Sequence, residues 1–388
     1  MKRINIISFG CFLLLFTISL SGYGEAVATQ QQSPVRGASV ASLQNQPENQ
    51  WEKTVAEGKK EGKVMVYTII GSASRQALSA AFEKRYGIQL EFWSGARGAE
   101  ITQRLLTERQ AGLYLADAVI AGTTDLIPDL KPKGLLQPLD SFLILPEAMD
   151  AKAWRGGQLP FLDKQHTAVG MLVQYLRHLI RNTDLVKEGE ITSYKDLLKP
   201  QWKGKAVLRD PTTTGNANTW ITFLALKVWG LEPTKEFLRQ FAQTDPAILR
   251  DTRLQVEWVA RGKYPLGIAT RMENTDEFVR KGAPIAWVRV AEGGLISAGS
   301  SSLGIINRPA HPNAVKVFLN WLLTREGQTV LAKAYGYPSG RSDVSTEGID
   351  TSGLPTPGEK FYLDDEENIL AKSNMLVVGK EIFSSMVK

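Results

Sequence analysis

The 388-residue sequence predicts an α/β protein with two lobes, each a mixed or parallel sheet flanked by helices. Three observations support this fold class. The length exceeds what one hydrophobic core usually serves. Strand and helix patterns alternate in two separate stretches, and one long β-prone run precedes the second stretch while another follows it. We therefore expect two interleaved lobes joined by two β crossovers.

The first stretch begins near Trp51 and alternates strands with helices. Its expected strands are "KVMVYTII" at 63–70, "IQLEFW" at 88–93 and "ADAVIAG" at 116–122. Helical spacing follows the first strand up to Gly87 and the second strand up to Gly112. This order predicts a parallel sheet with covering helices, on which ligands bind outside the carboxyl ends of the strands.

The second stretch follows a β-prone run at 166–186 that leaves the first lobe. Strands are expected at "GKAVLRD" and "KYPLGIAT", with a helix between them at 221–230. A second β-prone run at 283–294 leads to a long helix at 311–336, in which Pro312 suits the first turn. We assign 51–165 and 296–388 to lobe one, and 166–295 with the crossovers to lobe two.

The N-terminus has the pattern of a secretory signal peptide. Lys2 and Arg3 precede an apolar run over 4–20, and "AVA" at 26–28 is a small-residue cleavage pattern. A membrane anchor is the weaker alternative, because a spanning helix needs about 20 apolar residues. We expect a signal peptide over 1–28, a flexible lead-in over 29–50 that is rich in Gln and Ser, and a periplasmic protein.

Composition and motifs argue against several function classes. The net charge of +6 comes from scattered basic residues, which argues against nucleic acid as a partner. "GKKEGKV" at 58–64 is not a P-loop, and "GARGAE" at 95–100 is not a dinucleotide fingerprint. His166, His178 and His311 lack metal-ligand spacing, and no nucleophile-elbow serine is present. We expect no catalytic residues, no cofactor and no metal.

Polar loops that follow strands and open helices recur in both expected lobes. Helix N-termini leave backbone N–H groups free and carry partial positive charge, so several of them aimed at one cleft would bind an anion. Helix capping explains one Ser or Thr per helix, whereas "TTT" exceeds that need. The hydroxyl candidates are Ser72, Ser74, Ser94, Thr123, Thr212, Thr213 and Thr214.

The stretch "GIATRMENT" ends a predicted strand with charged and amide side chains. Arg271 and Arg97 are the candidate fixed cations, because guanidinium binds carboxylate or phosphate in bidentate fashion. The alternative for Arg271 is a structural ion pair with Glu273 or Asp276. Further ligand-binding candidates are Glu273, Asn274, Tyr337 and Arg341.

Two longer segments carry a family resemblance that spans about residues 51–385. "NTDLVKEGEITSYKDLLKPQWKGKAVLRDPTTTGN" and "RPAHPNAVKVFLNWLLTREGQTVLAKAYGYPSGRSDV" resemble the substrate-binding proteins of ABC importers. The similarity is to the two-lobed type II periplasmic binding protein fold, the Venus flytrap, in its ferric-iron-binding-like branch. It implies a monomer that captures a solute by hinge closure and delivers it to an inner-membrane permease without chemistry.

The sequence departs from this branch at the metal ligands. The resemblance implies paired tyrosines after "PLGIAT" and, in many members, a histidine after the first strand. Here these positions read Arg271-Met272-Glu273-Asn274 and Gly71-Ser72-Ala73-Ser74. An arginine repels ferric ion, so we expect a small organic anion, a carboxylate or a phosphate or phosphonate.

Two alternatives remain open. One keeps iron, with Tyr67, Tyr264 or Tyr337 as unconventional ligands. The other is a secreted hydrolase that uses Ser72 or Ser94, for which the sequence offers no adjacent general base.

Overall fold

The computed structural model describes residues 40–387, and the chain from Gln44 on forms one compact unit. The predicted signal peptide over 1–28 and residues 29–39 of the lead-in lie outside the described residues. Residues 40–50 belong to helix α1 (Val40–Glu61), so the prediction of a flexible lead-in is wrong there. Within 40–387, no helix is both long and apolar enough to cross a membrane.

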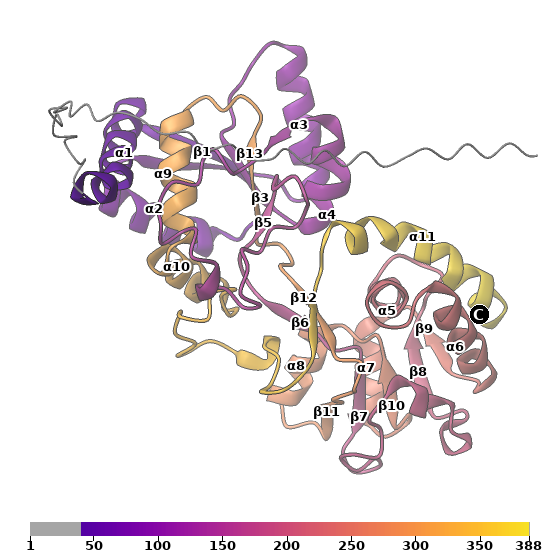
Figure 1. Cartoon of the computed structure of the whole chain (residues 1–388). Helices are drawn as coiled ribbons and strands as arrows, with labels where there is room; N and C mark the ends of the chain where they lie inside the picture. Colours follow the sequence, from indigo (N-terminus) through magenta and orange to yellow (C-terminus); the bar gives the residue numbers. More distant parts are fainter. Residues whose placement is uncertain (1–39, 388) are drawn as a thin grey trace, which may run out of the picture. The chain divides into compact units, whose positions relative to one another are not determined.

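The first lobe is built on a six-stranded mixed sheet with the order β2-β1-β3-β13-β4, and β5 pairs with β13 (Figure 1). The expected parallel core is present, because β1 pairs in parallel with β2 and with β3. Strand β13 returns from a distant part of the chain and runs antiparallel to β3. The strands are β1 (Lys63–Thr68), β2 (Gln89–Ser94), β3 (Ala118–Ala121), β4 (Leu136–Gln137), β5 (Val169–Gly170) and β13 (Ser302–Ile306).

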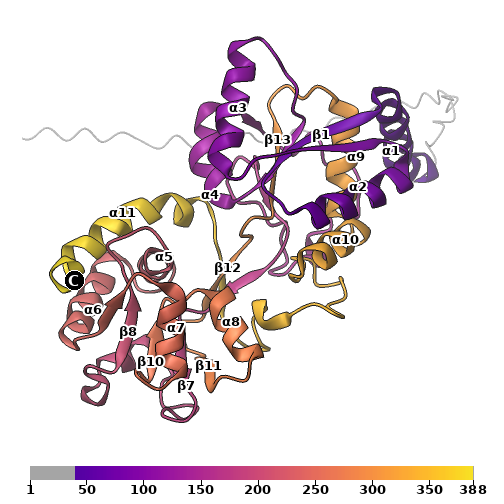
Figure 2. The same cartoon turned by 180° about the vertical axis from the view of Figure 1, so that it is seen from behind.

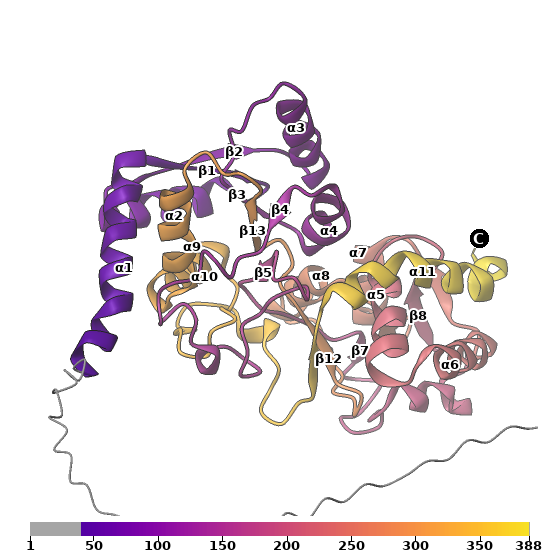
Figure 3. The same cartoon turned by 45° about the horizontal axis from the view of Figure 1, so that its top comes forward.

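Helices cover both faces of this sheet. Figure 3 shows α2, α9 and α10 on one side and α3 and α4 on the other. Their bounds are α2 (Ser72–Tyr86), α3 (Gly98–Gln110), α4 (Thr123–Asp125), α9 (Pro312–Leu323) and α10 (Arg325–Tyr335). The core includes Phe82, whose ring lies 5.4 Å from that of Phe318 and 5.3 Å from that of Trp321. All three are fully buried. Burial of a large apolar side chain stabilises the folded state by about 2–3 kcal/mol.

The long helix predicted at 311–336 is interrupted. Thr324 lies between α9 and α10 in extended conformation, and its side chain accepts a hydrogen bond from the Gly327 N–H. Threonine is a good N-cap because its hydroxyl satisfies a free donor of the first turn. Thr324 therefore starts a second helix. Pro312 lies in the first turn of α9, as predicted.

The second lobe has a five-stranded sheet with the order β11-β7-β10-β8-β9. Strand β8 pairs in parallel with β9 and β10, whereas β7 runs antiparallel to β10 and β11. The strands are β7 (Leu179–Asn182), β8 (Ala206–Arg209), β9 (Ala247–Leu249), β10 (Leu266–Ile268) and β11 (Ile285–Trp287). The flanking helices are α5 (Asn216–Phe223), α6 (Leu231–Gln243), α7 (Thr252–Ala260) and α8 (Met272–Arg280).

A small sheet of the order β14-β12-β6 lies between the two larger ones (Figure 2). Its strands are β6 (Gln174–Leu176), β12 (Gly294–Ser297) and β14 (Phe361–Leu363). Strands β6 and β12 are antiparallel and form the two predicted crossovers. Strand β14 pairs in parallel with β12 and is a third passage of the chain, which the sequence did not reveal.

The C-terminal helix α11 (Glu366–Phe383) corrects the predicted lobe boundary. Figures 1 and 2 show α11 beside α5 and α6. Its residues Met375, Val378 and Phe383 join the core of the second lobe. The assignment of all of 296–388 to lobe one is therefore wrong for this helix, because β14 carries the chain back before α11 begins.

Short helical turns complete the described secondary structure. They are Leu126–Leu130, Lys131–Lys133, Ala151–Ala153, Tyr194–Leu198, Pro200–Trp202, Leu224–Val228, Thr351–Gly353 and Ser384–Met386.

Candidate ligand-binding site

A polar cavity of about 480 Å³ lies where the crossover strands meet the first turns of α5 and α8. Its volume is in the range of small-molecule sites, about 300–1,000 Å³. Lobe one contributes Thr124 of α4, and α11 contributes Lys372. The crossover segments and lobe two supply the rest: Gln174, Leu176, Arg177, His178, Ser297, Gly299, Asn216, Thr219, Thr270, Arg271, Met272 and Glu273.

A larger groove of about 740 Å³ lies beside the start of α11. Its carboxylates include Asp163 and Asp365. Asp163 pairs with Lys131 at 2.8 Å, and Asp365 pairs with Lys227 at 2.6 Å. These charges are already used to hold the start of α11 in place, so the groove is not our candidate site.

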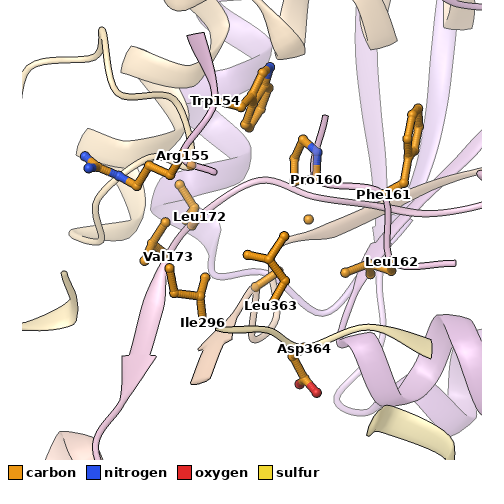
Figure 4. A pocket seen from close by; sticks show the side chains of 13 residues that line it. Trp154, Arg155, Pro160, Phe161, Leu162, Leu172, Val173, Ile296, Leu363 and Asp364 are labelled. Atoms are coloured by element: carbon orange, nitrogen blue, oxygen red, sulfur yellow. The ribbon is translucent and has the colours of Figure 1, made fainter. Parts of the chain in front are cut away.

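A third hollow, of about 40 Å³, lies among the crossover segments. Figure 4 shows apolar side chains such as Trp154, Phe161 and Leu172 around it, and the charged ends of Arg155 and Asp364 point away. It has room for only one or two waters. Of these three, the cavity of 480 Å³ has a suitable size and polar groups from the crossovers, α5, α8 and α11, and we take it as the candidate site.

Three cations line this cavity, and each has a carboxylate partner. Arg177 forms a bidentate pair with Glu359, with N–O distances of 3.0 and 2.7 Å. Lys372 lies 3.0 Å from Asp364. Glu359 and Asp364 are 3% and 1% exposed and do not line the cavity. Their charges therefore compensate the two cations from behind.

Arg271 meets Glu273 rather than Asp276. The Nε of Arg271 donates to Oε2 of Glu273 at 3.0 Å, and both side chains are about half exposed. Asp276 instead accepts hydrogen bonds from Trp287 and Ser352. The structural ion pair that the sequence left open is thus formed. Both of its members line the cavity.

The backbone between β10 and α8 positions Arg271. Ala269 has a left-handed φ of 56°, and its N–H donates to the His178 carbonyl at 2.6 Å. A non-glycine residue in this region costs about 1 kcal/mol or more and is held by its surroundings. The Asn216 side chain donates to the Thr270 carbonyl at 2.9 Å. This bond ties the first turn of α5 to the residue before Arg271.

His178 is a buried polar group in the lining. Burial, followed by the nearby Lys372 charge, lowers the pKa of its imidazole to about 3, so the ring is neutral at pH 7. Within the described chain, its Nε2 has no hydrogen-bond partner. Buried polar groups are rarely left unpaired, which marks His178 as part of the polar floor of the site.

The four candidates from the first two loops of lobe one do not line the cavity. Ser72 is exposed, Ser74 is buried and donates to the Ala334 carbonyl, and Ser94 accepts from Arg75. Arg97 is 80% exposed and lies 3.7 Å from Glu100. For Ser74 the predicted ligand contact is wrong, because its hydroxyl is turned into the lobe.

Internal carboxylates occupy the helix start that was expected to hold a ligand in lobe one. A Cβ at Gly98, the first residue of α3, would lie 2.1 Å from the Asp125 carboxyl group. The Ala96 N–H donates to Glu100. Gly98 therefore permits close approach of the protein's own carboxylate rather than of a ligand.

The three threonines after β8 follow the same principle. The Asp210 carboxylate accepts from the N–H and hydroxyl of Thr212 at 2.8 and 2.7 Å and pairs with Arg250. Thr213 donates to the Asp210 carbonyl, and Thr214 is exposed outside the lining. The prediction that Thr212 and Thr213 offer hydroxyls to a ligand is wrong in this conformation.

Four further candidates lie outside the lining. Thr123 is buried, and its N–H donates to the Gly299 carbonyl. Asn274 donates to Thr252. Burial first, then the Glu273 charge, raises the pKa of the Tyr337 phenol. Arg341 is wrong as a ligand contact, because it is 2% exposed and bonded to Asp343 and two carbonyls.

Most of the lining residues are not among those that the sequence predicted. Arg177 and His178 lie in the crossover that follows β6, and Lys372 lies on α11, where no local pattern distinguishes them. Asn216 and Thr219 open α5 directly after the "TTTG" loop. For these two a signal was present: the helix start itself, rather than the loop before it, faces the cavity.

In the described chain, no set of side chains is arranged for either alternative, the serine hydrolase or the iron site. His166 and His311 each lie 2.8 Å from an aspartate, Asp140 and Asp117, and neither bonds to a serine. Tyr67 is buried against Glu108, and Tyr264 packs on Trp258. Among residues 40–387, no group of three or more His, Cys, Asp or Glu side chains could hold a metal ion.

A two-lobed α/β chain with a polar cavity at its crossovers has the architecture of a periplasmic binding protein. The family model described as bacterial extracellular solute-binding protein matches residues 77–354. The chain therefore belongs to this family of substrate-binding components of ABC importers, which implies a location outside the cytoplasm. No curated protein sequence matches the chain significantly.

Solved structures share the fold at low sequence identity. Ferric iron-binding protein A of Mannheimia haemolytica, in an open conformation, aligns with a TM-score of 0.64 and 16% identity over 83% of this chain and 98% of its own. For IdiA (FutA) of Trichodesmium, with iron and citrate, the values are 0.60 and 18% over 84% and 99%. For AfuA of Actinobacillus pleuropneumoniae, with fructose-6-phosphate, they are 0.55 and 18% over 84% and 98%. These similarities establish the fold and leave the solute open.

Proposed function

We propose that this protein binds a small organic anion, a carboxylate or a phosphate or phosphonate, in the cavity between its lobes. It then delivers this solute to an ABC permease in the inner membrane. One observation carries the choice of an anion. Arg271 lines the cavity, and within residues 40–387 its Nη1 and Nη2 form no hydrogen bond.

The surroundings of Arg271 support this choice. It is the N-cap residue of α8, where free N–H groups and the helix dipole favour negative charge. Lys372 spends one of its three N–H donors on Asp364, which leaves two for a ligand. The first turn of α5 adds Asn216 and Thr219. Together these groups form a site for one small anionic group.

The proposed cycle is hinge closure across the crossover strands. Thr124 of lobe one and Arg271 of lobe two line the same cavity, so a ligand that contacts both favours the closed form. The permease recognises the closed form of a periplasmic monomer that was exported by its signal peptide. No step requires bond making or breaking.

The test is calorimetric titration of the purified protein with a panel of small carboxylates, phosphates and phosphonates. At least one binds, and Arg271→Ala weakens it about tenfold to a hundredfold, because hydrogen bonds to charged groups are worth about 1.5–3 kcal/mol. Arg253→Ala is the matched control, since Arg253 is a half-exposed, ion-paired arginine outside the lining.

Two results would contradict the proposal. One is that Arg271→Ala and the control Arg253→Ala both bind the anion with the affinity of the wild type. The other is a protein that binds no member of the panel but takes up ferric citrate with the colour of an iron phenolate complex, which would favour Tyr67, Tyr264 or Tyr337 as ligands.

A further inference from the structure

The Arg271–Glu273 pair uses only part of the bonding capacity of each residue. A single hydrogen bond of 3.0 Å joins Nε to Oε2. In the described part of the chain, Nη1 and Nη2 of Arg271 and Oε1 of Glu273 form no hydrogen bond. The side chains are 58% and 45% exposed, and both line the cavity. The pair therefore presents two donor nitrogens, with four N–H groups, and one acceptor oxygen side by side to a ligand that enters.

Glu273 has a different position from the other carboxylates of the site. Glu359 and Asp364 stand behind Arg177 and Lys372 and are nearly inaccessible. Among the described residues that line the cavity, Glu273 is the one with a negative charge. A ligand therefore meets the charge of Glu273 directly.

The charges around the cavity are balanced before a ligand enters. Each of the three cations has one carboxylate partner, and burial keeps His178 neutral. Closure of the lobes removes water, and an unpaired charge in a dry site is costly. A ligand with only a negative charge would leave this balance disturbed, whereas one that also brings a positive charge to Glu273 would preserve it.

We infer that the solute is an anion that also carries an ammonium group. This inference rests on the proposed anion site. The carboxylate or phosphate of the solute accepts from Nη1 and Nη2 of Arg271, and its ammonium donates to Oε1 of Glu273. Glu273 is thus the residue that selects ammonium-bearing anions over simple ones.

An ammonium group fits the site better than a hydroxyl group. Both donate a hydrogen bond to the charged Glu273, but only the ammonium adds the attraction between two opposite charges. Only the ammonium also restores the charge balance. The neutral hydroxyl is therefore the control that separates hydrogen bonding from charge.

The experiment compares ligands that differ only in this one group. Calorimetric titrations use β-alanine, β-hydroxypropionate and propionate as one series, and ethanolamine phosphate, glycol phosphate and ethyl phosphate as the other. In at least one series the wild-type protein binds the amine about tenfold more tightly than the hydroxyl compound. Glu273→Gln abolishes that preference, because the amide oxygen still accepts a hydrogen bond but carries no charge.

Glu277→Gln is the matched control. Glu277 is on the same helix, pairs with Arg253 and Lys281, and lies outside the lining. The variant Glu277→Gln should therefore keep the wild-type preference for the amine. Because Glu273 is about half exposed, its substitution leaves the fold intact, which an unchanged melting temperature verifies.

The outcomes separate the two proposals. If all three members of a series bind the wild type equally, or if Glu273→Gln retains the amine preference, the ammonium inference is wrong and the anion site stands. If propionate or ethyl phosphate binds best and tightens further in Glu273→Gln, Glu273 merely competes for Arg271, and the inference is again wrong. If no compound binds the wild type, the anion site fails and the inference fails with it.

Discussion

Glu359→Gln removes the charge that holds Arg177 in the wall of the cavity. The two side chains are 3% and 11% exposed and share two hydrogen bonds. Arg177 also donates to the Ser352 and Leu354 carbonyls, and the N–H and hydroxyl of Thr356 donate to Glu359. The pair therefore anchors the segment after residue 350 to the crossover that carries Arg177.

Loss of one partner from a buried ion pair costs about 3–5 kcal/mol, because the remaining charge is left uncompensated. At neutral pH we expect the free energy of unfolding of Glu359→Gln to be lower by about that amount. Burial raises the pKa of Glu359, but hydrogen bonds from Arg177 and Thr356 outweigh it, so the net pKa lies below its usual value.

The sign of the pH dependence follows from this lowered pKa. A carboxyl group whose pKa is lower in the folded state stabilises the protein above its unfolded pKa of about 4.3, and this stability is lost as the pH falls through the folded pKa. The difference between wild type and Glu359→Gln should therefore be full at neutral pH and should shrink in acid, below about pH 4.

Urea unfolding at several pH values measures this difference. Glu232→Gln is the control, since Glu232 is 73% exposed in its pair with Lys235 and should change stability by less than about 0.5 kcal/mol. A loss below about 1 kcal/mol in Glu359→Gln at neutral pH, or a difference that persists unchanged in acid, would refute the reasoning.

Two further predictions concern α11 and His178. Gly379→Ala places a Cβ about 2.1 Å from the Pro211 carbonyl and should lower the free energy of unfolding in urea by roughly 1–3 kcal/mol. Gly71→Ala is the control, because a Cβ there meets nothing within 4 Å and should cause no such loss. Equal losses in the two variants would contradict the packing of α11 against Pro211. In the folded protein the pKa of His178 is about 3, whereas in the unfolded chain it is about 6.5. As the pH falls below about 6.5, the unfolded chain therefore binds a proton before the folded protein does. The free energy of unfolding of the wild type should then decrease by up to ~1.4 kcal/mol per pH unit. The variant His178→Gln should flatten that slope in the same assay, and an unchanged slope would place the titration elsewhere.

Much of the fold follows from patterns that the chain carries locally. Strands β1, β2 and β3 are apolar runs, and the segments between them have apolar residues at helical spacing. Both patterns arise because one face of each element is buried. The break at Thr324 was missed because the apolar spacing of α9 continues into α10, so periodicity outweighed a single capping residue. The position of α11 was missed because an apolar face is compatible with either lobe until its packing partner is known.

The site was predictable only where the signal is local. Arg271 stands out because a cation directly follows a buried strand. The loops "GARG" and "DPTTT" carry equally strong signals, yet Glu100 accepts from the Ala96 N–H of the first loop and Asp210 accepts from Thr212 of the second. A helix N-terminus stays free for a ligand only where no carboxylate of the chain packs against it. This depends on tertiary contacts, which the local sequence does not show.

The central claim is that Arg271 holds an organic anion in the cavity between the lobes. Native mass spectrometry of protein purified without refolding tests it most directly, because a retained solute reports its own mass. The claim predicts that the wild-type protein carries an organic acid and that Arg271→Ala, prepared in the same way, has lost it. A bound mass equal to iron, or an organic acid retained equally by both proteins, would contradict it.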